Sequence, residues 1–114
     1  MKEFLTIEES ARLIELGVDK NLVDIVSANE PYYPDDVEFS LGALLSILPK
    51  KITDRRDIYN LTIGVNSEDL WYAKYLNEHE CWDSLNSYQE AHELCDCIYD
   101  MIVWLKEKPQ LTWL

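Results

Sequence analysis

Two histidines and two cysteines in the C-terminal half have the most distinctive chemistry in this sequence. They follow the pattern H-x-C-x10-H-x2-C and comprise His79, Cys81, His92 and Cys95. Zinc accepts imidazole and thiolate ligands in a tetrahedral site, but the usual C-x2-C half-site is absent. Cys95 also falls on the apolar side of a predicted helix, where a small buried hydrophobic residue is expected without a metal. We therefore keep these residues as weak zinc candidates and expect no bound metal or cofactor.

Signatures of catalysis are missing from the sequence. Hydrolysis and acid–base catalysis need a nucleophile, a base and an orienting group that converge. The chain has two histidines and three glycines, and it contains no G-x-S-x-G, H-E-x-x-H or phosphate-binding glycine loop. The acidic pairs Asp35-Asp36 and Glu68-Asp69 fall in predicted turns, where such residues are common. We predict that the protein is not an enzyme.

Two of the zinc candidates, His92 and Cys95, belong to the longest helical pattern, which runs from Tyr88 to Lys106. At 100° per residue its apolar side chains fall in one arc around Ile98, and Trp104 falls outside that arc. Ser87 is placed to cap the start of the helix. Such an amphipathic helix needs a sheet or other helices to cover its apolar face.

Two shorter helices are predicted in the N-terminal half. Thr6 and Glu9 form a capping box, which predicts a helix over residues 7–16. Ser40 is a good N-cap, and leucines spaced at helical intervals predict a second helix over residues 41–48. A proline directly after that stretch ends the helix.

Strand patterns occupy the remaining apolar stretches. Residues 58–65 alternate between apolar and polar, and residues 70–76 return after a turn, which predicts a β-hairpin. Residues 22–28 are interpreted as a strand, with a helical turn as the alternative, and residues 37–39 as a short second strand. The order α-β-β-α-β-β-α predicts an α+β fold, in which helices pack on an antiparallel sheet of three to four strands.

Length and composition indicate one soluble domain. The 114 residues, of which 47% are hydrophobic, are enough for one packed core, so we predict a single domain over residues 1–114. No stretch approaches the roughly 18 apolar residues of a membrane span, and the opening MKEFLTIEES resembles no secretory leader. We therefore expect a cytoplasmic protein that does not bind membranes and whose three cysteines are free thiols.

Charge is the most unusual bulk property of the chain. It carries 22 acidic and 10 basic residues, a formal net charge of −12. A surface of that sign repels phosphate, so we predict no direct binding to nucleic acid. A local exception is a basic island, which we interpret as a solvated loop and which comprises Lys50, Lys51, Arg55 and Arg56.

Large aromatic residues are the best candidates for a partner surface. Four Trp and seven Tyr are more than a domain of this size buries easily, and exposed Trp side chains often anchor protein interfaces. The candidates are Trp71, Trp104 and Trp113. We predict a non-catalytic protein that binds another protein, and self-association stays open as a further mode.

The acidic residues support an alternative function. A decoy protein can present rows of carboxylates in place of DNA phosphates and so block the cleft of a nuclease or restriction enzyme. The candidate row lies on the predicted last helix and comprises Glu90, Glu93, Asp96 and Asp100. An ordinary acidic surface explains the other carboxylates equally well.

Five segments of the chain also carry a family resemblance. They are, in order, TIEESARLIELGVD, FSLGALLSILPKKI, YNLTI, LWYAKY and MIVWLKEK. Their order resembles a group of small uncharacterised proteins from prophages and mobile elements of gut anaerobes related to Bacteroides. The resemblance implies an intracellular protein carried by a mobile element, and it brings no activity, cofactor or catalytic residue with it.

Overall fold

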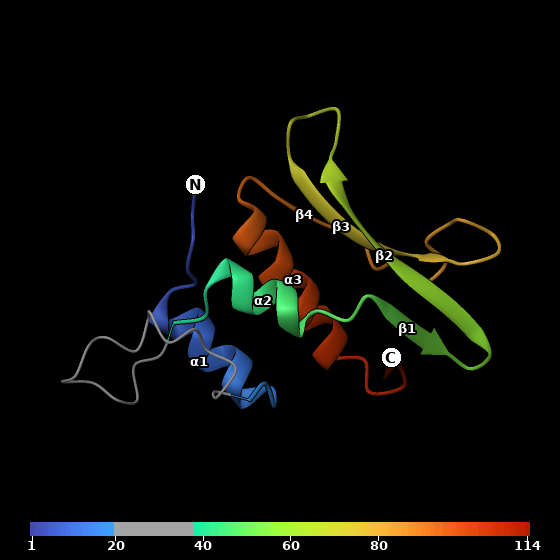
Figure 1. The fold of residues 1–114 in the computed structure, drawn as a ribbon, viewed down its shortest axis with the longest axis horizontal. Coiled ribbons are helices and arrows are strands. Elements are labelled where there is room, and N and C mark those ends of the chain that lie inside the picture. Colours follow the sequence, from blue (N-terminus) through green and yellow to red (C-terminus); the bar gives the residue numbers. More distant parts are fainter. Residues whose placement is uncertain (20–37) are drawn as a thin grey trace.

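Three helices and one five-stranded antiparallel sheet make up the described part of the chain (Figure 1). The computed structural model describes residues 1–19 and 38–114. In chain order the elements are α1 (Ile7–Glu15), α2 (Leu41–Ile47), β1 (Lys51–Asp54), β2 (Asp57–Val65), β3 (Trp71–Asn77), β4 (Gln89–Ala91), α3 (Leu94–Lys106) and β5 (Thr112–Trp113). The predicted α+β class and antiparallel sheet are confirmed, whereas the predicted strand number and element order are wrong.

The sheet has the strand order β4-β3-β2-β1-β5. The predicted hairpin is its centre: β2 and β3 pair over seven positions, from Tyr59 opposite Asn77 to Val65 opposite Trp71. The helices lie on one side of the sheet, where α3 packs against β3 and β4 and is itself contacted by α1 and α2 (Figure 1). None of the described helices has the length and apolar character that crossing a membrane requires.

The two N-terminal helices begin where their capping residues predict. At the start of α1, the Glu9 N–H donates to the Thr6 hydroxyl (3.1 Å) and the Thr6 N–H donates to the Glu9 carboxylate (3.0 Å). Gly17, with φ of +99°, follows the end of α1 in a backbone conformation that glycine adopts without strain. At α2 the Ala43 N–H donates to the Ser40 hydroxyl (3.0 Å). These local predictions are confirmed.

The predicted long helix is wrong at its N-terminal end. Helix α3 begins at Leu94, and Glu93 occupies its N-cap position without a capping side chain. Residues 89–91 instead form β4, which pairs with residues 71–73 of β3. Pairing satisfies backbone groups along the β3 edge, which a helix at this place would leave open. Ser87, the predicted cap, is buried beside Tyr75 of β3.

Two further strands were not predicted. Lys51–Asp54 forms β1, which turns into β2 through the two-residue loop of Arg55 and Arg56. The basic island therefore spans part of a β-hairpin rather than one loop, although all four of its side chains are exposed to solvent as predicted. Arg55 has a φ of +60° at the turn. At the C-terminal end Thr112–Trp113 forms β5 against β1. Both strands are short: β1 pairs with the adjacent β2, and β5 forms because β1 offers a partner far along the chain.

Two predicted strands lie wholly or partly outside the described residues. The strand interpretation of residues 22–28 lies outside the described residues, as does residue 37 of the second short strand. Residues 38 and 39 belong to no strand, although the next residue, Ser40, forms an isolated bridge with Phe4. Phe39 is fully buried, and its carbonyl accepts a hydrogen bond from the Leu5 N–H (2.9 Å), so the segment enters α2 from within the core.

The apolar face of α3 is the centre of the hydrophobic core. Its predicted arc is buried from Cys95 to Leu105, with Ile98 and Met101 fully inaccessible to water. The side chains packed around it come from α1, α2, β1 and β3 and include Leu13, Leu44, Ile52 and Tyr75. Because this face of α3 is used by the core, the side chains of α3 that remain at the surface are those of its outer face.

Candidate functional site

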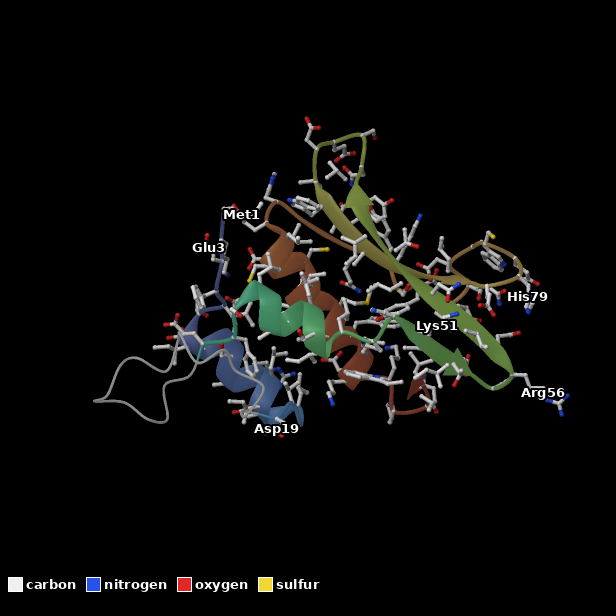
Figure 2. The ribbon with its side chains drawn as sticks, viewed as in Figure 1. Met1, Glu3, Asp19, Lys51, Arg56 and His79 are labelled. Atoms are coloured by element: carbon white, nitrogen blue, oxygen red, sulfur yellow. The ribbon has the colours of Figure 1, made fainter. Side chains whose placement is uncertain are left out.

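The four zinc candidates do not meet in space. His79 and Cys81 are exposed in the loop after β3, His92 is exposed between β4 and α3, and Cys95 is buried in the first turn of α3. Figure 2 shows His79 in that loop, beyond the end of the hairpin. Within residues 1–19 and 38–114, no group of three or more His, Cys, Asp or Glu side chains is arranged to hold a metal ion.

The buried thiols are chemically quiet. Cys95 and Cys97 are both inaccessible to water, and this burial raises the pKa of each thiol to about 11. At neutral pH they stay protonated, whereas a nucleophilic or metal-binding cysteine requires the thiolate. Cys97 also donates its S–H to the Gln89 carbonyl of β4 (3.5 Å), so it helps to join helix and edge strand.

The three tryptophans predicted to form a partner surface are each half-buried. Trp71, Trp104 and Trp113 all pack against the core, and none stands free in solvent. Lys106 Nζ lies 4.6 Å from the ring centre of Trp113, and Lys108 Nζ lies 5.5 Å from that of Trp104. The most exposed tryptophan is Trp82, with 56% of its surface accessible to water, and the sequence patterns did not single it out.

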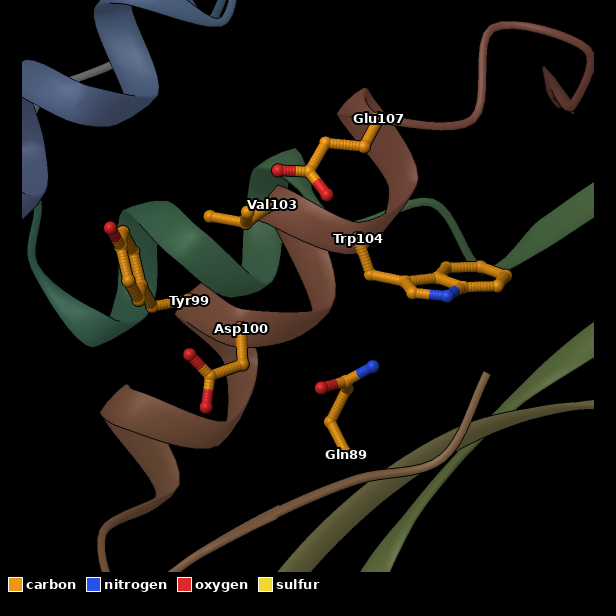
Figure 3. A pocket seen from close by; sticks show the side chains of 6 residues that line it. All are labelled: Gln89, Tyr99, Asp100, Val103, Trp104 and Glu107. Carbon is orange, nitrogen blue, oxygen red and sulfur yellow. The ribbon is translucent and has the colours of Figure 1, made fainter. Parts of the chain in front are cut away.

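Trp104 lies in a shallow depression on the outer face of α3. The depression measures about 260 Å³, and it is lined by Gln89, Tyr99, Asp100, Val103, Trp104 and Glu107. Figure 3 shows the Trp104 indole extending to one side of α3, Tyr99 and Val103 to the other, and Asp100 and Gln89 below them. Four of the six lining residues come from consecutive turns of α3, Glu107 is the C-cap residue of that helix, and Gln89 comes from β4.

Asp100 is the uncompensated charge of this depression. It forms no hydrogen bond or ion pair with any other described residue. Packing of the helix face removes part of its water shell, and this desolvation raises the Asp100 pKa above its ordinary value. The carboxylates of Asp96 and Glu9 raise it further. A cation at this position would relieve both effects.

The other charges of the depression are partly paired. Glu107 approaches Arg12 of α1 at 3.6 Å, which is longer than a close charged hydrogen bond. Lys108, in the tail after α3, contacts the indole of Trp104 with its ammonium group. Both contacts involve half-exposed side chains, so each is weak and readily exchanged for another partner.

The predicted acidic row is interrupted. Glu90 lies on β4 rather than α3, and its carboxylate accepts hydrogen bonds from Asn66 (2.9 Å) and Tyr88 (3.0 Å). Glu93 accepts from the backbone N–H of Lys2 (2.9 Å). Glu90 and Glu93 therefore make contacts within the fold and do not continue the line of Asp96 and Asp100 along α3, while the decoy alternative stays a prediction.

Lys2 ties the N-terminal segment to two helices. Its ammonium group contacts Glu9 of α1 (2.8 Å) and Asp96 of α3 (2.6 Å). Desolvation alone would lower the Lys2 pKa, but the hydrogen bonds to Asp96 and Glu9 outweigh it and raise that pKa. For Glu9, burial raises the pKa, yet the hydrogen bonds from Lys2 and Thr6 prevail and hold it below its ordinary value.

This bridge predicts an acid-dependent stability. Because the Glu9 pKa is lowered on folding, its contribution is present above the ordinary glutamate pKa and is lost as the pH falls through the folded pKa. We expect Lys2→Met to lower the free energy of unfolding by about 1 kcal/mol at pH 6 and by clearly less at pH 3. Urea denaturation at both pH values measures this, and an equal loss at both would contradict the role of the bridge.

The chemistry available at the depression is the recognition of a positively charged group by an aromatic ring and carboxylates. Comparisons with protein families, curated proteins and solved structures find no match to this chain.

Proposed function

We propose that this protein is a non-catalytic interaction module that binds another protein through the outer face of α3 around Trp104. The observation that carries the proposal is that Trp104 and Val103 remain half-exposed in a depression that no described element covers. Large aromatic side chains in such depressions are typical energetic centres of protein interfaces. The resemblance in segment order supports a setting inside the cell, in a prophage or mobile element.

Trp104 is the central residue of this proposed interface among the three candidate tryptophans. Trp113 belongs to β5, where it pairs with Ile52 of β1, and Trp71 belongs to β3, where it pairs with Val65 and Ala91. Both therefore also serve the sheet, and neither lines the depression. Their half-exposed rings can extend an interface but are not needed to form it.

The proposal predicts a tryptophan-specific loss of binding. In affinity capture from the native host, we expect Trp104→Ala to reduce recovery of a specific protein at least about tenfold, the loss typical of an interface hot spot. Trp82→Ala is the matched control, since it removes the most exposed indole at a distant loop and should leave recovery unchanged. A partner that is retained by Trp104→Ala in full would show that this face is not the binding surface.

A further inference from the structure

The Trp104 ring already accepts a cation. Lys108 Nζ lies 5.5 Å from its centre, near the roughly 6 Å limit of a cation–π contact. Lys108 belongs to the tail after α3 and is half-buried, so its ammonium group remains close to water. This contact shows that a positive group can reach the indole face, and its length shows that the position is not filled tightly.

A carboxylate lines the same depression as that ring. Asp100 precedes Trp104 by four residues, and side chains at this spacing are neighbours on a helix surface. Both line the depression, and so does Glu107. Asp100 has no charged partner among the described residues, and Glu107 has Arg12 at 3.6 Å. An incoming cation would therefore meet an aromatic face and a free carboxylate without having to displace a strong ion pair.

Arginine fits these features better than lysine does. Its guanidinium group is planar and weakly hydrated, so it can lie flat on an indole while its N–H groups donate to a carboxylate. A lysine ammonium is compact, keeps its water more firmly, and has no plane to stack. The net charge of −12 also attracts basic segments from a distance and repels acidic ones.

From this geometry we infer that the depression receives an arginine side chain of a basic segment of the partner protein, stacked on Trp104 and paired with Asp100. The inference rests on the proposed interaction function and names the chemistry of its partner. Lys108 then acts as an internal occupant that the arginine replaces.

A short peptide tests this directly on the full chain. The probe is acetyl-Gly-Gly-Arg-Gly-Gly-amide, and the control peptide carries citrulline, which has nearly the same shape but no charge. NMR follows the indole N–H of Trp104, which a Trp104→Phe spectrum identifies. We expect a saturable shift with a dissociation constant of about 1–10 mM for the arginine peptide, at least about fivefold weaker binding of the citrulline peptide, and no shift at Trp82.

Two variants and one control variant sharpen the assignment. Asp100→Asn should weaken the arginine peptide about fivefold or more, and Asp69→Asn, the same change in an exposed turn, should not. Lys108→Gln should strengthen binding about two- to fivefold, because it removes both a competitor for the ring and a like charge. A merely structural role for Lys108 predicts no gain.

The outcomes separate this inference from the proposed function. If the Trp104 signal does not saturate, if citrulline matches arginine, or if Asp100→Asn binds unchanged, the arginine assignment is wrong. If Trp104-dependent capture of a protein succeeds despite that result, the interaction function stands and its partner uses other chemistry at the depression. Failure of both experiments removes both proposals.

Discussion

Leu44→Ala is expected to lower the free energy of unfolding by about 2–5 kcal/mol, whereas Leu45→Ala, one position later, is expected to lower it by less than about 1 kcal/mol. Leu44 is fully buried and Leu45 is 42% exposed, although both belong to α2. Truncation of Leu44 leaves a cavity between α2 and the rest of the core. Truncation of Leu45 removes atoms that already contact water.

The pair is informative because the two substitutions are chemically identical. Helix propensity changes by the same amount at both positions, so the difference between the variants reports burial alone. Helix α2 has seven residues, too few to be stable in isolation, and it depends on packing against α3. Urea denaturation followed by tryptophan fluorescence measures both free energies. Equal losses would mean that α2 presents a different face to the core.

Ser87→Ala is expected to lower the free energy of unfolding by about 1–3 kcal/mol, an unusually large effect for the loss of one hydroxyl group. The Ser87 hydroxyl is buried, accepts a hydrogen bond from the Tyr75 N–H (2.7 Å) and donates one to Asp83 (2.9 Å). Alanine leaves the Tyr75 N–H without an acceptor inside the protein. The lost stability is the free energy of keeping the Tyr75 N–H away from water without a hydrogen bond.

Ser46→Ala is the control for this substitution. Ser46 is exposed on α2, where its hydroxyl donates only to the Gly42 carbonyl, so its removal should change stability by no more than about 0.5 kcal/mol. Hydrogen exchange gives a second measurement, since the Tyr75 amide should exchange faster in Ser87→Ala than in the native chain. Unchanged exchange at Tyr75 would show that water or another group replaces the hydroxyl.

The predictions that succeeded depend on residues close together in sequence. A capping box places α1, a serine cap places α2, and alternation around Ile63 places the central hairpin. The failures depend on distant partners. The sequence has helical spacing from Tyr88 onward, but residues 89–91 pair with the edge of β3 instead of joining the helix. Strand β5 forms only because β1 is available to pair with it.

The candidate site shows the same difference between features set by nearby residues and features set by distant contacts. The periodicity of α3 correctly separates Trp104 from the buried arc, because both features follow from one helix. It does not reveal that Gln89 contributes from β4, or that Lys2 engages Asp96 from 94 positions away in the chain. Such contacts decide which acidic side chains lack a charged partner. The sequence alone therefore could not distinguish Asp100 from Asp96.

The outermost strands of the sheet also limit how copies of this protein can associate. Strand β4 has three residues and β5 has two, and the β3 edge beyond β4 is occupied by the Ser87 hydroxyl at Tyr75 and by the Trp82 carbonyl at Asn77. A long open edge is a template on which further chains add as fibrils. With so few free edge groups on the described strands, we expect concentrated solutions to resist amyloid growth, and any self-association to proceed through side-chain surfaces.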